Sequence, residues 1–165
     1  MEEYVKEILY VYPLLVTVEK DYEEHIKNRA LLSYKSGMTA ERLVEYLAEE
    51  IVWKENLTAL KAGVERVMDK LSQTEKALLE IRYFGRKRKE KILKTEAGQA
   101  WSRRKYFRMQ DKLEERLDGL FIKEGLTKET YIQSWAESEP FKAVRKRLQK
   151  RERQKREALT GAGTR

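Results

Sequence analysis

The chain has 165 residues, of which 41% are hydrophobic and 39% are charged, and its formal net charge is +8. It has no cysteine, which excludes disulfides and thiolate metal sites and fits a reducing cytoplasm. The charge is uneven: residues 1–84 hold 12 Lys and Arg against 16 Asp and Glu, and residues 85–165 hold 24 against 12. A polyanionic partner would therefore meet the C-terminal half.

The first segment, residues 2–33, has apolar side chains whose spacing favours a helix from Pro13, a residue tolerated in the first helical turn. Residues 11–18 are β-branched enough for a strand, but no partner strand is visible later in the chain. The longest apolar run, residues 8–18, is too short to span a bilayer. We expect a cytoplasmic protein without a membrane segment, in which the single histidine, His25, is a surface residue.

Residues 39–71 are predicted to form one long helix that Thr39 caps, about 48 Å long at 1.5 Å per residue. Gly63 interrupts it at a cost of about 1 kcal/mol relative to alanine. Its apolar stripe predicts either an antiparallel hairpin with residues 4–32 or, because part of the spacing is heptad-like, self-association through residues 40–71. Tyr46 and Trp53 lie off that stripe, which makes them candidate contact residues.

Residues 72–84 have the signature of a short capped helix. Ser72 and Glu75 have the spacing of a capping box, and Gly85 stands where a helix often ends in a left-handed residue. The dense basic run of residues 86–94 follows. Such a run contacts phosphates or solvent and does not read bases.

A second capped helix is predicted behind Ser102, with Trp101 packing as a hydrophobic staple. The apolar side is formed by Tyr106, Met109, Leu113, Leu117 and Leu120. Arg104 and Arg108 point the opposite way at 100° per residue. Two short capped helices, the second apolar on one side and basic on the other, suggest a helix-turn-helix that binds DNA.

The runs LSQTEKALLEIRYFG (71–85) and WSRRKYFRMQDKLEERL (101–117) resemble the last helix-turn-helix of bacterial sigma factors, region four. They are more similar to phage late-gene activators of the RinA and ArpU type. Residues 95–102 depart from the family's first-helix pattern, and Ile92 and Leu93 are candidate replacements for its apolar contacts. The resemblance implies a transcriptional regulator of phage or mobile-element type that binds double-stranded DNA.

The predicted DNA-binding residues belong to the second helix and to the basic run. They are Arg103, Arg104, Lys105, Phe107, Arg108 and Lys112, with Arg86, Lys87, Lys89 and Lys91. Arg104 and Arg108 are expected to read bases, and the lysines of the basic run to hold phosphate. Phe107 is expected either to touch a thymine methyl or to fold back onto Trp101.

The C-terminal part is predicted to contain two further helices. Thr127 is expected to cap a short one, whose Tyr131, Ile132 and Trp135 dock onto the helix-turn-helix. Pro140 is expected to open a basic last helix that buries little apolar surface, so that removing residues 140–165 would hardly change stability. Residues 160–165 are expected to form a disordered tail.

The sequence therefore predicts an all-α protein in three parts: a long-helix hairpin (1–71), a helix-turn-helix domain (72–138), and a basic helix with a tail (139–165). No catalytic constellation, cofactor motif or metal-ligand spacing is present in the sequence, so we expect no enzyme and no cofactor. Sequence-specific transcriptional regulation is the leading interpretation. The alternatives are a helical module that binds nucleic acid without sequence preference, and a stand-alone sigma-like factor that contacts RNA polymerase.

Overall fold

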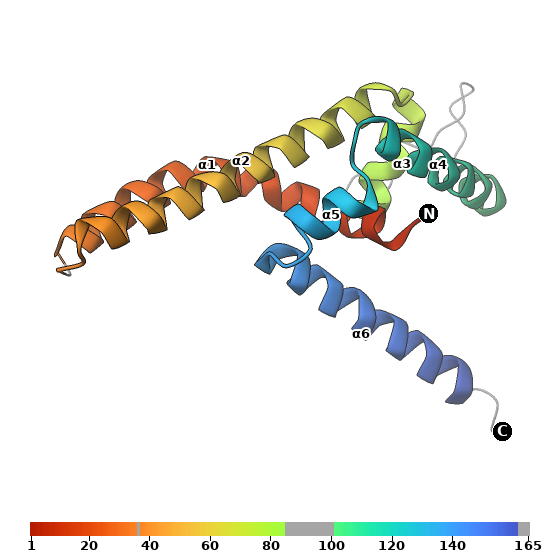
Figure 1. The fold of residues 1–165 in the computed structure, drawn as a ribbon. Helices are drawn as coiled ribbons and strands as arrows, with labels where there is room; N and C mark the ends of the chain where they lie inside the picture. Colours follow the sequence, from red (N-terminus) through yellow and green to blue (C-terminus); the bar gives the residue numbers. More distant parts are fainter. Residues whose placement is uncertain (36, 85–100, 162–165) are drawn as a thin grey trace.

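The structure is a computed structural model that describes residues 1–35, 37–84 and 101–161, without the side chains of residues 18–23, 25, 29, 33–35, 155 and 159–161. In these ranges the chain is helical and has no strand, which confirms the all-α fold class (Figure 1). The helices are α1 (Glu3–Lys35), α2 (Ala40–Asp69), α3 (Gln73–Tyr83), α4 (Arg103–Lys123), α5 (Lys128–Ser134) and α6 (Glu139–Gly161). The expectations for the His25 side chain, for Gly85 and for residues 86–94 fall outside the described structure.

Helix α1 begins ten residues earlier than the sequence predicts, and Pro13 lies inside it. The alternative of a strand over residues 11–18 is also wrong. Proline removes a backbone hydrogen bond to the residue four positions earlier, so packing has to offset that loss. The side chains of Tyr4, Ile8, Val11 and Leu15, at helical spacing on both sides of the proline, are all buried. The helix therefore continues through Pro13 because one face of it is fixed in the core.

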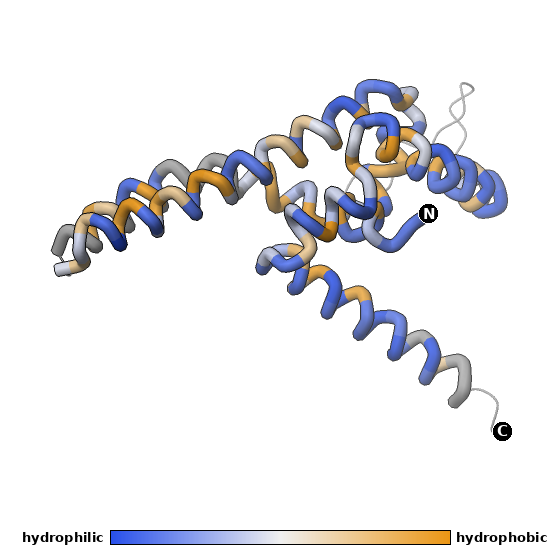
Figure 2. The backbone as a smooth tube through the Cα atoms, in the orientation of Figure 1, coloured by the Kyte–Doolittle hydropathy of each residue, from blue (hydrophilic) through white to orange (hydrophobic). Residues whose placement is uncertain are grey.

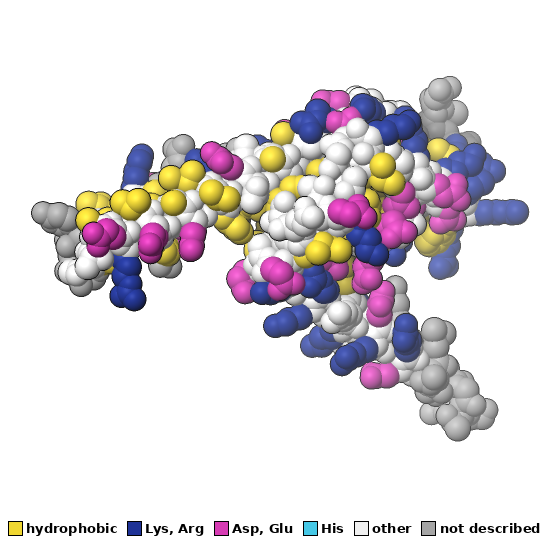
Figure 3. Space-filling view, in the orientation of Figure 1, with side chains coloured by type: hydrophobic (Ala, Val, Ile, Leu, Met, Phe, Trp, Pro, Cys, Tyr) yellow, Lys and Arg dark blue, Asp and Glu magenta, His cyan; other side chains and the backbone are white. Residues whose placement is uncertain are grey.

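Helices α1 and α2 pack side by side, joined by a turn in which Gly37 has a φ of 69° (Figure 1). We call residues 16–56 of this pair the arm. No described side chain of the arm is buried, although the same two helices contain buried residues on either side of it, up to Leu15 and from Leu57. Hydrophobic side chains are instead visible along the arm's surface (Figure 3). The described side chains of the arm thus form no apolar core, and such a core is the usual source of helix stability in proteins.

The helix starts are set by side-chain caps, at the positions that the sequence predicts. The Thr39, Ser72, Ser102 and Thr127 hydroxyls each accept a hydrogen bond from the backbone N–H three residues later, at 3.4, 3.2, 3.2 and 3.3 Å respectively. At Ser72 the box is complete, because its own N–H donates to Glu75 Oε2 at 2.8 Å. These four caps place the starts of α2, α3, α4 and α5.

The core lies where the first part of α1 and the second part of α2 meet the other helices. It includes the whole heptad-like stripe, which consists of Leu57, Leu60, Val64 and Val67 of α2 and of Leu71 just after the end of that helix. Gly63 has a packing role beyond its effect on helix propensity. A Cβ atom built there would lie 3.0 Å from Leu126 Cδ2, so any larger residue would require the Leu126 side chain to shift.

Helix α6 is part of the core at its start, contrary to the expectation that it buries little. Pro140 lies in its first turn, as predicted, but Phe141 is fully buried, Val144 is buried and Leu148 packs against the core. The helix packs on α1 and continues to Gly161, so residues 160 and 161 are helical and do not belong to a disordered tail. The reason for the difference is tertiary, because α1 and α5 supply the apolar surface that covers Phe141.

A buried polar cluster fastens α5 and α6 to α1. Glu7 accepts a hydrogen bond from the Tyr131 hydroxyl, and Arg145 Nε donates to Glu7 Oε1 at 3.3 Å. The other end of the guanidinium donates to the Tyr131 hydroxyl and to the Ala136 carbonyl, both at 2.9 Å. Burial, together with the hydrogen bond to Glu7, raises the pKa of Tyr131 to about 12. One carboxylate of α1 thereby joins this helix to α5 and α6, which lie more than 90 residues later in the chain.

Tyr131 of α5 and Trp135, the residue after this helix, contact α1 and α2. The Trp135 indole N–H donates to the Asn56 carbonyl of α2 at 3.0 Å, and the Tyr131 and Tyr4 rings lie 5.9 Å apart. Docking onto residues 72–121 was expected. The hydrogen bonds that Tyr131 and Trp135 make to other helices run instead to Glu7 of α1 and Asn56 of α2. Ile132, the third residue predicted to dock, is exposed.

Candidate nucleic-acid interface

The candidate interface is the N-terminal half of α4. The buried side of α4 as a whole is as predicted: Leu113, Leu117 and Leu120 are buried, and Tyr106 and Met109 are half-buried against the core. This side fixes the rotation of the helix about its axis. As a result, the opposite side of the helix faces away from the protein. In the N-terminal half of α4 its exposed residues are Arg103, Arg104, Phe107, Arg108, Asp111 and Lys112.

That exposed face is strongly positive, with four cations against one acid. Arg104, Arg108 and Lys112 follow one another at intervals of four residues, so they form a line along the helix with a rise of about 6 Å from one to the next. Within the described part of the chain, none of the three is paired with a carboxylate. Like charges at this spacing repel one another, and a polyanion would relieve the repulsion. Lys and Arg side chains gather at the end of the molecule that α4 forms (Figure 3).

The C-terminal half of α4 contrasts with this, because two of its charged residues are paired with α3. Arg116 binds the Glu75 carboxylate at 2.6 Å, and Glu114 pairs with Arg82 at 3.2 Å. Burial of Glu75 opposes its ionisation, but the hydrogen bonds from Ser72 and Arg116 lower its pKa below the usual value. These contacts compensate charge where α4 meets α3 and leave the net positive charge of α4 on its first turns.

The aromatic residues around the start of α4 have different surroundings. Trp101 is partly buried against the core, and Lys105 Nζ lies 4.8 Å from the centre of its ring. Phe107 is 45% exposed, with the Arg103 guanidinium 5.7 Å from its ring centre. Trp101 thus packs against the core, while Phe107 presents an apolar edge among cations.

Six of the ten predicted DNA-binding residues are therefore brought together on the first three turns of α4. Lys105 is half-buried beside Trp101, and the other five are exposed. The remaining four, Arg86, Lys87, Lys89 and Lys91, lie outside the described residues, as does the segment 95–100 that would complete a helix-turn-helix.

The sequence-based set of sites missed two features. Gln110 is buried on the inner side of α4, and within the described structure neither atom of its side-chain amide has a hydrogen-bond partner. The second feature is α6, whose exposed cations are Lys146, Arg147, Lys150, Arg151, Arg153 and Arg156. The basic run that forms this helix is visible in the sequence, but its attachment to the core is not.

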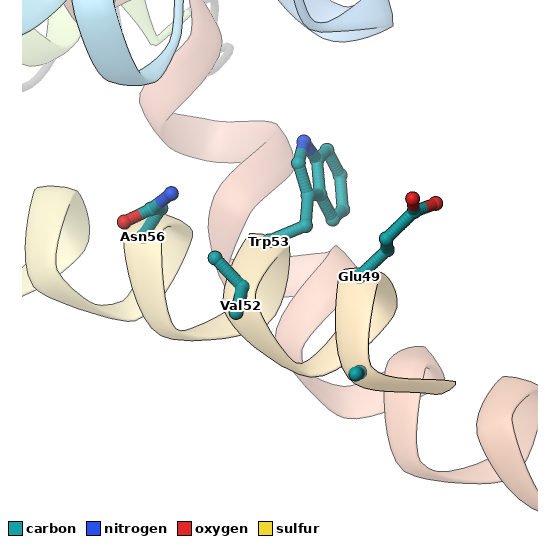
Figure 4. Close-up of a pocket in the computed structure, with 5 residues that line it drawn as sticks. Glu49, Val52, Trp53 and Asn56 are labelled. Atoms are coloured by element: carbon teal, nitrogen blue, oxygen red, sulfur yellow. The ribbon is translucent and has the colours of Figure 1, made fainter. Parts of the chain in front are cut away.

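The two candidate contact residues of the arm, Tyr46 and Trp53, both make contacts within the chain. The Tyr46 hydroxyl donates to Glu50 at 3.2 Å, and Trp53 is half-buried and packs against the core. Trp53 projects from α2 next to a shallow depression that Glu49, Val52 and Asn56 help to line (Figure 4). More apolar surface lies elsewhere on the arm, where Leu31, Leu32, Val44 and Val52 are each more than half exposed.

Comparison with known proteins gave no family model, no curated protein and no solved structure that matches this chain. In the described ranges, no helix combines the length and apolar character that a membrane crossing requires. The same ranges contain no group of three or more His, Cys, Asp or Glu side chains placed to bind a metal ion.

Proposed function

We propose that the protein is a sequence-specific DNA-binding transcriptional regulator of phage or mobile-element type, acting as an activator. The observation that carries the proposal is the exposed basic face of α4, in which Arg104, Arg108 and Lys112 form a line without carboxylate partners in the described structure. An α-helix is about 10–12 Å wide with its side chains, which matches the major groove of B-DNA. The buried side of α4 would hold that face outward.

In the proposed complex, the N-terminal half of α4 enters the major groove, as a recognition helix does. Arg104 and Arg108 read base edges, because arginine can donate two hydrogen bonds to guanine. Phe107 would touch a thymine methyl, because its ring is exposed in the same turns of the helix as the two arginines. Arg103, Lys112 and the lysines of the basic run contact phosphates and set the position of the helix on the duplex.

The test is selection of preferred sites from a random duplex library, followed by binding measurements. Replacing Arg104 by alanine should change the selected sequence and lower affinity for the original site by about 5- to 150-fold, the equivalent of 1–3 kcal/mol per arginine–guanine contact. Lys89→Ala, as the phosphate-contact control, should weaken binding to all sequences and leave the selected sequence unchanged.

Binding by the unmodified protein should also depend steeply on salt. If six to eight cations touch phosphate, affinity should fall by about a thousand-fold or more between 50 and 200 mM salt. Binding that is flat in salt contradicts DNA binding altogether. If Arg104→Ala and Lys89→Ala lower affinity equally on every sequence, base reading is contradicted. That result favours the module that binds nucleic acid without sequence preference.

We further propose that the arm is a protein-interaction surface that pairs two copies of the chain. None of its described side chains is buried, and Leu31, Leu32, Val44 and Val52 expose apolar side chains on it. A second copy could cover them, and a dimer would place two α4 helices on a palindromic site. RNA polymerase, the partner of a sigma-like factor, is the other candidate for the same surface.

Light scattering of the full chain at several concentrations tests the pairing. The expected result is a dimer that becomes a monomer in the Val44→Glu/Val52→Glu variant, because the two carboxylates would be buried unpaired in the interface. The control is Glu41→Gln/Glu45→Gln, which changes exposed polar residues of the same helix and should remain dimeric. A protein that is monomeric at all concentrations contradicts pairing and leaves polymerase as the candidate partner.

A further inference from the structure

The distal part of α6 has an unusual surface. Residues 149–157 contain no apolar side chain, and among them are five Lys or Arg and two Glu. They form a regular helix that projects away from the body of the protein, and its backbone is coloured as hydrophilic there (Figures 1 and 2). The described side chains of residues 149–157 are all exposed, so this part of α6 contacts nothing in its own chain that would bury it.

The first two turns of this helix, residues 139–145, which we call its root, are attached to the core. Phe141 and Val144 are buried in the core, and Arg145 is held by Glu7, Tyr131 and the Ala136 carbonyl. The basic part is therefore a continuation of a helix whose direction the core sets. Binding of such a preformed element costs less ordering entropy than binding of a flexible tail.

The charges along the projecting part repel one another. Lys146 and Lys150 are four residues apart, and so are Arg147 and Arg151, which places like charges next to each other on the helix surface. Each such pair disfavours the helix, whereas Glu152 with Arg156 and Arg153 with Glu157 have the opposite-charge spacing that favours it. None of the described side chains of residues 149–157 is buried, so burial does not offset the repulsion. A ligand that carries closely spaced negative charges would remove the repulsion.

The chemistry of the surface distinguishes between polyanions. A membrane-surface helix needs an apolar face, and a protein groove is filled by apolar anchors, and residues 149–157 offer neither. A duplex with phosphates on both sides of a groove suits a helix that is basic around its circumference. The major groove of B-DNA is about 12 Å wide and admits a helix, whereas that of A-form RNA is too narrow for side chains to read.

We propose that residues 146–156 of α6 form a second DNA-binding surface, which lies in or along the major groove of duplex DNA and contacts its phosphates. This surface adds a sequence-independent contact to the proposed function of α4, and it does not depend on base reading by Arg104 and Arg108. The protein would then hold DNA at two separate helices, of which α4 provides specificity and α6 provides affinity.

The experiment uses the full chain with the substitutions Lys150→Gln, Arg151→Gln and Arg153→Gln, all at exposed positions beyond the core. A matched control, Lys27→Gln/Arg42→Gln/Lys128→Gln, removes the same charge from exposed sites outside α4 and α6. Binding to a random-sequence DNA duplex is measured by fluorescence anisotropy over a salt series. Circular dichroism checks that both variants keep their helicity.

The slope of log affinity against log salt should become shallower by about 2 to 3 in the α6 variant, close to 0.9 for each lost phosphate contact, and remain unchanged in the control. Binding to A-form RNA duplexes and to vesicles of anionic lipid should lose less of its salt dependence in the α6 variant than binding to DNA does. An unchanged DNA slope overturns the proposal, and so does an equal loss on RNA or on vesicles, which would assign the surface to those ligands. The sequence selected by α4 should be the same in the α6 variant, so failure of either proposal can be recognised separately.

Discussion

Replacing Phe141 by alanine is expected to lower the free energy of unfolding by about 3–5 kcal/mol, as is typical when a buried phenylalanine is truncated. Phe141 is fully buried at the root of α6, and its ring lies 5.5 Å from that of Tyr131 in an edge-on arrangement. The substitution removes apolar surface from the junction of α1, α5 and α6 and leaves a cavity there. Urea denaturation followed by circular dichroism measures the change.

Ile132→Ala is the matched control, because Ile132 is a large apolar residue of the neighbouring helix α5 that is 57% exposed. Its loss should change stability by no more than about 0.5 kcal/mol. If Phe141→Ala has an equally small effect, α6 does not belong to the core. The division of the chain at residue 139 would then hold, and removal of residues 140–165 would leave stability unchanged.

The elements that the sequence predicts best are those with local causes. A helix cap involves residues three positions apart, so Ser72 with Glu75, and Ser102 with the N–H of Lys105, could be identified without any knowledge of the fold. The amphipathic pattern of α4 is also local. Its rotation about the helix axis, and hence the exposure of Arg104 and Arg108, follows from the positions of Leu113 and Leu117.

The features that the sequence does not reveal have causes that are distant along the chain. Pro13 is a helix-starting residue by local rules, but the buried residues before it extend the helix to Glu3. Glu7 looks like any other exposed glutamate until Arg145, 138 residues away, is brought to it. In the same way, Gly63 is a weak point in a helix until Leu126 packs against it.

The candidate interface likewise has features with local causes and features with causes that are distant along the chain. The composition of its exposed face could be predicted, because a helical period and one buried stripe determine it. The pairing of Arg116 with Glu75 and of Glu114 with Arg82 could not, because it depends on how α3 packs against α4. That pairing takes up one cation and one acid of α4, so it leaves the net charge of the helix unchanged. The positive charge of the first turns can be read from the sequence, and the structure adds that these cations are exposed.

The second large effect is expected at the cluster of Glu7, Tyr131 and Arg145, and it should be asymmetric. Glu7 is 4% exposed, whereas the Arg145 side chain is 31% exposed. Arg145→Met leaves a buried carboxylate without its cation and should destabilise the protein by about 3 kcal/mol or more. Glu7→Leu leaves an arginine that can turn toward solvent, so its effect should be smaller, at about 1 kcal/mol.

The double variant Glu7→Leu/Arg145→Met removes both charges and should regain much of the stability that Arg145→Met loses, since apolar residues of similar size can replace a buried ion pair at little cost. Urea denaturation of the four proteins gives the coupling energy between the two side chains. Additive effects of the two single substitutions would show that the pair does not join α6 to α1. An effect of Glu7→Leu as large as that of Arg145→Met would show that the guanidinium is as confined as the carboxylate. In that case the root of α6 is held more tightly than the exposure of Arg145 indicates.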